Sequence, residues 1–189
     1  MWYFVSDLHL GHENQLHRGG RGDYFSSIEE HDKTILNNLL SLPRSSNLFI
    51  LGDLFFHYNK EKTDKFFQLF ANKKIRLHLG VGNHDKPNKW THKIIQSKFE
   101  MKTIKIENQK IVLCHYPLTV WDGSHKNTWN LYGHIHKNDW TDTKAKELGM
   151  LNNGKQLNVN LEFHDFKPWG FEEIKEVMNK KSNNWDYIE

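Results

Sequence analysis

The chain has 189 residues, which suits one domain over residues 1–189, and its 37% hydrophobic and 13% aromatic content is enough to bury a core. One cysteine excludes a disulfide framework and a cysteine-rich zinc module, and a formal net charge of +3 does not predict the concentrated basic surface of a nucleic-acid-binding protein. No apolar run approaches the roughly 18 residues of a membrane span. The 13 histidines contain no tandem run, which directs attention to metal binding.

Five apolar runs rich in β-forming residues predict strands, and a polar cluster with histidine, aspartate or asparagine follows each run at once. The predicted strands are residues 2–6, 47–52, 75–82, 110–116 and 129–135. The first lies in MWYFVSDLHLGHEN, which has no basic lead and meets Asp7 and His9 too early for a signal peptide. We therefore expect a cytoplasmic protein.

Three segments between these runs predict helices. Residues 26–43 open on two serines, each with a glutamate three positions later as in a capping box, and end in a proline that stops a helix. Residues 63–72 carry a phenylalanine-rich amphipathic pattern, and residues 87–99 predict a third helix that starts at a proline. Because strands and helices alternate here, the sequence predicts a βαβ series with a partly parallel sheet.

The second half of the sequence has a different rhythm. Residues 103–114 predict a hairpin around Glu107–Gln109, and the short interval between His115 and His134 leaves little room for a helix. We therefore expect this half to be more antiparallel, because antiparallel strands need only short connections. The remaining predicted elements are a loop over 136–155 with a turn at Asn153–Gly154, a strand over 156–163 and a closing helix over 170–178.

Residues that can bind a metal follow each of the five predicted strands. Asp7-Leu8-His9 and His134-Ile135-His136 are i, i+2 pairs, whose outer side chains share one side of an extended chain while the middle residue packs inward. Carboxylate, imidazole and amide donors suit a first-row divalent metal better than Ca²⁺ or a thiolate site. The residues at the strand ends are Asp7, His9, Asp53, Asn83, His84, His115, His134 and His136.

These residues stand in five motifs that resemble, in order, those of the calcineurin-like metallophosphoesterase superfamily. The family pattern is D-x-H, G-D, G-N-H-[DE], a lone histidine after a strand, and G-H-x-H. The chain contains SDLHLGH, LGDLF, GVGNHDKP, LCHYP and LYGHIH in that order, and they are similar to motifs of small bacterial and phage phosphoesterases. The resemblance implies an α/β fold, a four-layer αββα sandwich of two mixed β-sheets flanked by helices, with a dinuclear metal site at the carboxyl ends of the strands.

The resemblance also implies a role for each motif residue. Two sets of ligands would share Asp53 as a bridge: Asp7, His9, Asp53 and His136 for one ion, and Asp53, Asn83, His115 and His134 for the other. His84 would not bind a metal; it would point at the phosphate and assist the leaving group. Asp85 would orient His84 or cap the following helix.

The activity implied by the resemblance is that of a phosphoesterase, a hydrolase that acts on phosphoric ester bonds through attack by a metal-bridging hydroxide. We favour a phosphodiester or nucleotide-type substrate, either a small molecule or a nucleic acid. We expect two divalent metal ions, with Mn²⁺ ahead of Fe, Zn and Ni. A nuclease and a catalytically inactive interaction module of the same fold are the alternatives. We expect no membrane partner and no obligate protein partner.

Three more residues are candidate substrate contacts. His12 and Asn14 lie just past the first pair of ligands, and Arg21 stands between glycines in GGRGDYF. An arginine can clamp phosphate oxygens with two parallel hydrogen bonds, so Arg21 could bind the phosphate of a substrate. The alternative for all three is a solvent-exposed loop with no role in the site.

Overall fold

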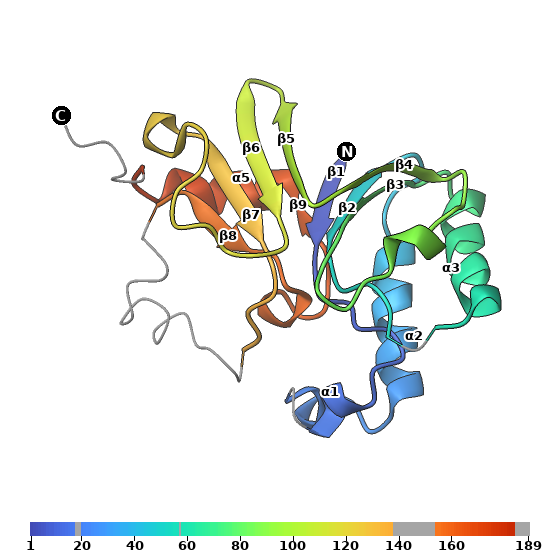
Figure 1. Ribbon diagram of the computed structural model, residues 1–189. Helices are drawn as coiled ribbons and strands as arrows, with labels where there is room; N and C mark the ends of the chain where they lie inside the picture. Colours follow the sequence, from blue (N-terminus) through green and yellow to red (C-terminus); the bar gives the residue numbers. More distant parts are fainter. Residues whose placement is uncertain (18–19, 57, 138–153, 184–189) are drawn as a thin grey trace.

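The computed structural model describes residues 1–17, 20–56, 58–137 and 154–183, and its first sheet has five strands in the order β4-β3-β2-β1-β9 (Figure 1). The four strands β1 to β4 are parallel to their neighbours, whereas β9 runs antiparallel to β1. The predicted βαβ series is therefore confirmed. The strands of this sheet are β1 (Trp2–Val5), β2 (Asn47–Leu51), β3 (Arg76–Gly80), β4 (Ile95–Phe99) and β9 (Trp169–Gly170).

The second sheet has four strands in the order β5-β6-β7-β8. Strands β5 and β6 form the predicted antiparallel hairpin, but β6 with β7 and β7 with β8 are parallel pairs. The second half is more antiparallel than the first, as expected, because β5 with β6 and β9 with β1 are antiparallel pairs, whereas β1 to β4 pair only in parallel with one another. The two parallel pairs of the second sheet were not expected, since the connection from β6 to β7 contains only the short 3-10 helix η3 (Ser124–Lys126). The strands are β5 (Met101–Ile106), β6 (Gln109–Cys114), β7 (Trp129–Tyr132) and β8 (Gln156–Asn158).

Two long helices cover one face of the first sheet, as Figure 1 shows: α2 (Ile28–Leu40) and α3 (Lys60–Asn72). Ser27 caps the start of α2, since its side chain accepts a hydrogen bond from the Glu30 backbone N–H. The capping box is only half formed, because the Glu30 carboxylate accepts the backbone N–H of Ser26 and not that of Ser27. The closing helix α5 (Phe171–Asn179) contacts β9, β1 and β8. The described chain also has the short helices α1 (Asn14–His17), η1 (Arg21–Asp23) and η4 (Leu161–Phe163).

The apolar core has two main clusters. One lies between the first sheet and helices α2 and α3, and the other contains residues of both sheets and of α5. In the second cluster, Phe4 of β1 stacks on Phe49 of β2 with ring centroids 5.2 Å apart. The fold is therefore α/β with two mixed sheets flanked by helices, as predicted. Within the described residues, no helix is long and apolar enough to span a membrane.

Two predicted elements differ from the structure. Residues 87–99 are not a helix: a 3-10 helix η2 (Pro87–Lys89) is followed by strand β4, whose residues are alternately half-buried and exposed. The predicted strand over 156–163 ends at Asn158 and gives way to η4. The predicted turn at Asn153–Gly154, and most of the predicted loop over 136–155, lie outside the described residues.

Candidate metal centre

Five loops that leave the carboxyl ends of strands converge at one edge of the two sheets. Both sheets contribute, since three loops follow β1, β2 and β3 and two follow β6 and β7. This edge is where open α/β sheets bind their ligands. The loops carry Asp7 and His9, Asp53, Asn83 with His84, His115, and His134 with His136.

The backbone at four of these residues is left-handed, a conformation uncommon for residues other than glycine. The φ angles are 58° at Asp7, 49° at His9, 54° at Asp53 and 71° at His134. The extended geometry assumed for the i, i+2 pairs was therefore wrong, although Leu8 is fully buried as that argument expected. Such strained backbone concentrates at functional sites, where surrounding contacts hold it in place.

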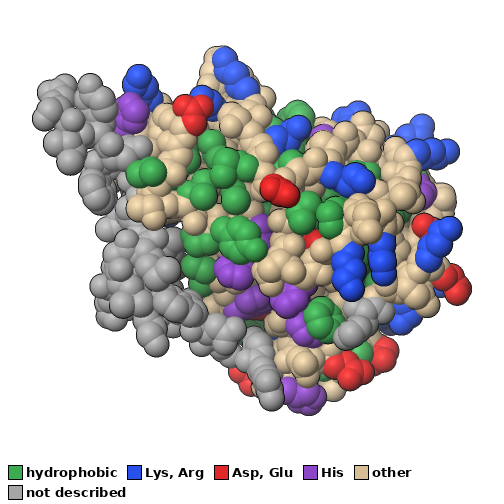
Figure 2. All heavy atoms as spheres, in the orientation of Figure 1, with side chains coloured by type: hydrophobic (Ala, Val, Ile, Leu, Met, Phe, Trp, Pro, Cys, Tyr) green, Lys and Arg blue, Asp and Glu red, His purple; other side chains and the backbone are tan. Residues whose placement is uncertain are grey.

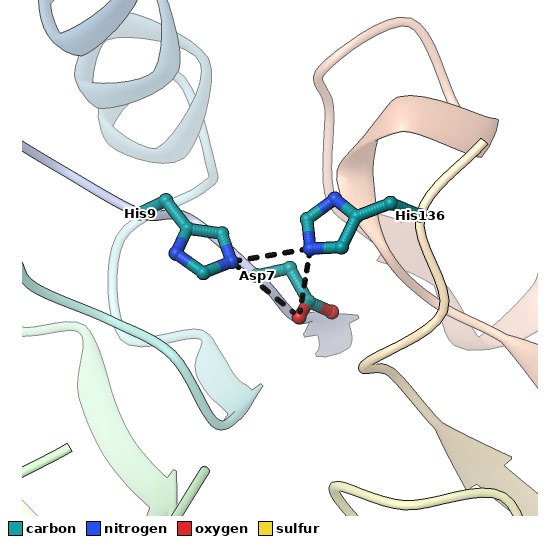
Figure 3. A group of neighbouring side chains, drawn as sticks. All are labelled: Asp7, His9 and His136. Atoms are coloured by element: carbon teal, nitrogen blue, oxygen red, sulfur yellow. Dashed lines mark hydrogen bonds and ion pairs between the residues drawn. The ribbon is translucent and has the colours of Figure 1, made fainter. Parts of the chain in front are cut away.

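One group of possible metal ligands consists of Asp7, His9 and His136 (Figure 3). Asp7 Oδ1 lies 3.8 Å from the Nε2 atoms of both histidines, and those two nitrogens are 3.2 Å apart. The other oxygen, Oδ2, accepts hydrogen bonds from Ser6 Oγ and from the His134 backbone N–H. Asp7 Oδ1 itself is buried and has no hydrogen-bond partner among the described residues. An unpartnered buried oxygen facing two imidazole nitrogens fits a cation.

The second group consists of Asp7, Asp53 and His115. Asp53 Oδ2 lies 3.6 Å from His115 Nε2 and 3.7 Å from His9 Nε2, so it stands between the two groups. Asn83 Oδ1 is 3.1 Å from His115 Nε2. His134 is exposed at the rim, with its ring centroid 5.1 Å from that of His115.

The second ring nitrogen of three histidines is engaged away from the centre. His115 Nδ1 is 2.8 Å from the Leu51 carbonyl oxygen, and His136 Nδ1 is 2.7 Å from Glu162 Oε1. Both oxygens can only accept, so Nδ1 carries the proton, and in the neutral imidazole the Nε2 lone pair is then available to a metal. His9 Nδ1 faces His12 Nδ1 at 3.3 Å. The three Nε2 atoms are thus the ones presented to the centre.

Two glycines allow this close approach of loops. A Cβ atom at Gly133 would collide with Ser6 Oγ and Asp7 Oδ2. Gly52 has a φ of +96°, and a Cβ there would collide with the His115 ring. The glycines that precede Asp53 and His134 in the sequence motifs therefore leave space for the neighbouring ligand.

Burial shifts the pKa values of several groups in the centre. It lowers the pKa of His9 well below its ordinary value, and the Arg21 guanidinium lowers it further. His9 is therefore a neutral imidazole at neutral pH, the form that binds metals. Burial also raises the pKa of Asp53, against the opposing effect of His115. For His136, burial lowers the pKa, but the hydrogen bond and charge of Glu162 outweigh this and raise it.

His84 stands at the mouth of the centre and not inside either group. Its side chain is 37% exposed, and Nε2 is 4.0 Å from Asp53 Oδ2. Its ring lies edge-on to the rings of His9 and Phe56, both at 5.5 Å between centroids. The backbone N–H of His84 donates to Asp53 Oδ1, which ties this loop to the carboxylate between the groups.

Asp85 clamps two loops together instead of orienting the His84 ring or capping a helix. Its Oδ2 accepts the backbone N–H groups of Asp53 and Gly82, and its Oδ1 accepts that of Leu54. Burial raises its pKa to about 6, although these donors act in the opposite direction. The Asp85 carboxylate therefore positions Asp53 and the loop that carries His84.

Glu162 is a residue of the site that the sequence did not reveal. Its Oε1 accepts hydrogen bonds from Arg21 Nε and His136 Nδ1, both at 2.7 Å, and its Oε2 accepts the Lys137 N–H. Burial by itself would raise the pKa of Glu162, but His136 and Arg21 outweigh it and hold the pKa at about 2. The only sequence signal is an acid within the apolar run VNLEF, whose partners are far away along the chain.

Arg21 does not reach the mouth of the centre, in contrast to the role expected for it. Its side chain is fully buried, and its guanidinium donates to Glu162, to the backbone carbonyl oxygens of Asp7 and Leu8, and approaches His31. The expected phosphate clamp is therefore wrong. Arg21 holds the loop that carries the first two ligands.

His12 and Asn14 were also expected to contact the substrate, and the structure places one behind His9 and the other at the surface. His12 is buried behind His9, with its ring stacked on Phe56 at 3.7 Å between centroids. Its contact with His9 is that of a neighbour that orients the ring. Asn14 is exposed at the first residue of α1, and among the described residues no hydrogen bond joins its side chain to the centre.

Structure comparison matches this chain to several solved proteins. The chain is similar to a solved protein of unknown function, AQ665 from Aquifex aeolicus, with 26% identity and a TM-score of 0.70 over 94% of this chain and 98% of that one. Pseudomonas putida nuclease MPE matches at 22% identity and a TM-score of 0.42, covering 71% and 61% of the two chains. The phosphoesterase Yfce from E. coli matches at 16% identity and 0.38, covering 70% and 68%.

No curated protein matched the chain in the sequence comparison. A family model described as calcineurin-like phosphoesterase, however, matches residues 3–188. This match includes all five loops that converge at the candidate centre, together with the strands that they follow. The chain therefore belongs to the calcineurin-like phosphoesterase family.

Proposed function

We propose that this protein is a metal-dependent phosphoesterase with two adjacent cation sites. Asp7, His9 and His136 would hold one ion, while Asn83, His115 and His134 would hold the other. Asp53 would serve both. The observation that carries this proposal is the position of Asp53 Oδ2, 3.7 Å from His9 Nε2 and 3.6 Å from His115 Nε2. One carboxylate oxygen faces a nitrogen of each group, as a shared ligand requires.

Two bound divalent ions would supply an activated water and neutralise charge on the phosphoryl oxygens. The chain's own residues have three tasks around them. The Asp85 carboxylate fixes the loops that carry Asp53 and His84 through backbone hydrogen bonds. Glu162 keeps a proton on His136 Nδ1. His84, half-exposed at the mouth, donates a proton or a hydrogen bond to the departing oxygen.

Retention of both groups argues against the alternative of an inactive interaction module. Such a module has no need for an unpartnered buried oxygen on Asp7, since a buried polar atom without a partner costs free energy. A phosphodiester or nucleotide-type substrate remains our preference, and nuclease activity is one form of it.

Metal removal and restoration test the function directly. Protein treated with EDTA should lose activity on p-nitrophenyl phosphate and bis-p-nitrophenyl phosphate, because the carboxylates and imidazoles then lack the cations that bind the phosphoryl group. Readdition of Mn²⁺ should restore it best, with Fe²⁺, Zn²⁺ and Ni²⁺ as comparisons, and the diester should be the better substrate. Failure of all four metals to restore hydrolysis of either ester would overturn the proposal.

Substitution of the shared ligand tests the two-site arrangement. We expect Asp53→Asn to weaken binding at both sites, so that elemental analysis finds the metal content falling from two ions towards none. The amide oxygen can still accept the His84 N–H, so the loop should keep its place. Asn83→Ala is the matched control, because the Asn83 amide oxygen lies beside His115 of the second group and its loss should affect one ion. Loss of one ion in Asp53→Asn would contradict a shared ligand.

A further inference from the structure

A cavity of about 530 Å³ opens beside the candidate metal centre. Asn83 and His84 line both, so the cavity is continuous with the mouth of the centre. The rest of its wall includes Phe56 and Tyr58 from the loop after β2, and Lys86 and Lys89 from the segment at η2. This volume is in the range of small-molecule binding sites.

The charge of the cavity is positive. Lys86 and Lys89 are exposed, and neither ammonium group has a hydrogen bond or ion pair with another described residue. Asp85 is the one carboxylate among the described lining residues, and its oxygens already accept three backbone N–H groups. Figure 2 shows basic side chains gathered beside the exposed histidines. The cavity therefore suits an anion.

The aromatic part of the wall is held in place by its own contacts. The Phe56 ring stacks on His12 at 3.7 Å and lies edge-on to His84 at 5.5 Å. The Tyr58 ring stacks on Phe55 at 4.6 Å, and its hydroxyl donates to Asp32. Rings next to ammonium groups form the combination that binds bases and phosphates of nucleotides.

We propose that this cavity binds the leaving group of the substrate, and that the leaving group is a nucleoside bearing a second phosphate. The inference rests on the proposed function, because it takes His84 as the donor to the departing oxygen. A group that departs past His84 enters the cavity that His84 lines. The base then contacts the Phe56 and Tyr58 side, and the second phosphate lies against Lys86 and Lys89.

Three dinucleotides with the same scissile bond test this assignment: d(TpT), d(pTpT) and d(TpTp). Product analysis identifies which nucleoside departs. We expect the isomer with its extra phosphate on that nucleoside to show a kcat/KM about tenfold above that of d(TpT), since one charge-assisted contact has roughly this effect. The isomer with its phosphate on the other nucleoside should resemble d(TpT). Removing the departing base to leave an abasic sugar should cost about tenfold.

The preference ratio is the kcat/KM of the favoured isomer divided by that of d(TpT). The variant Lys86→Ala/Lys89→Ala should reduce this ratio to about one. The control with the same change of charge is Lys33→Ala/Lys105→Ala, which should keep the ratio. Lys33 on α2 and Lys105 on β5 are exposed and do not line the cavity. A second readout needs no turnover: calorimetry of the metal-loaded protein with thymidine 3′,5′-bisphosphate. We expect the Kd to weaken about tenfold in the Lys86→Ala/Lys89→Ala variant and to stay unchanged in the control.

The possible failures are distinguishable. If d(TpT) and bis-p-nitrophenyl phosphate are hydrolysed but the three dinucleotides react equally, the assignment of the cavity is overturned and the phosphoesterase function stands. An unchanged preference ratio in the Lys86→Ala/Lys89→Ala variant has the same meaning. If no phosphoester is hydrolysed with any metal, the proposed function falls. The titration with thymidine 3′,5′-bisphosphate then still decides whether the cavity binds a nucleotide. Equal Kd values for the unsubstituted protein and the two double variants would reject binding in the cavity.

Discussion

His84→Ala should keep its bound metal ions while kcat falls by about 10²–10⁴-fold on esters of weakly acidic alcohols, the range of a lost general acid. The side chain is 37% exposed and lies outside both ligand groups, so its removal leaves the cation sites complete. The backbone N–H that donates to Asp53 Oδ1 survives the substitution. Elemental analysis and steady-state kinetics on the same preparation measure the two effects together.

The identity of the leaving group separates proton donation from a merely steric role. A p-nitrophenolate leaves as a stable anion and needs little help, whereas an alkoxide needs a proton. The loss in His84→Ala should therefore be much smaller for a p-nitrophenyl ester than for an alkyl ester of the same phosphate. His17→Ala is the matched control, because His17 is exposed at the end of α1. Equal losses on both esters, or depletion of metal, would contradict the role of His84.

Most of the fold followed from hydrophobic patterning. The runs that became β1, β2, β3, β6 and β7 are short and rich in β-forming residues, and the structure shortens each by only a few residues. The segment 87–99 misled the prediction, since Pro87 stands where a helix could begin and Trp90 and Ile94 are four residues apart, as on one face of a helix. There β4 gains backbone hydrogen bonds as an edge strand beside β3, and its half-buried and exposed residues alternate. Short apolar runs are ambiguous until their partner strand is known.

In the site, too, the sequence revealed what depends on neighbouring residues and not what depends on residues far away along the chain. The residues at the strand ends were visible because each follows an apolar run directly. Their left-handed backbone could not be predicted from the sequence, because it is held by contacts between distant loops, such as the hydrogen bond from the His134 N–H to Asp7 Oδ2. Arg21, between glycines, was expected to bind phosphate or to lie in an exposed loop, and only its long-range partner Glu162 explains why it is fully buried.

Replacement of Glu162 should therefore have two separate consequences. Glu162→Gln should weaken metal binding by Asp7, His9 and His136 about 10–100-fold, the usual cost of losing the group that orients a metal-binding histidine. It should also lower the free energy of unfolding by about 3–5 kcal/mol, because Arg21 is left buried without its counter-ion. Mn²⁺ titration of metal-free protein measures the first effect, and urea denaturation of the same metal-free protein measures the second.

A second substitution separates the two effects. In Arg21→Met/Glu162→Gln the buried charge is gone, so the loss of stability should be smaller than the sum of the two single losses. Metal affinity should not recover, because His136 Nδ1 still lacks its carboxylate acceptor. Glu61→Gln, at an exposed position in the first turn of α3, is the control for loss of a carboxylate. Normal Mn²⁺ affinity in Glu162→Gln, or recovery of affinity in the double variant, would show that Glu162 stabilises the loops without orienting His136.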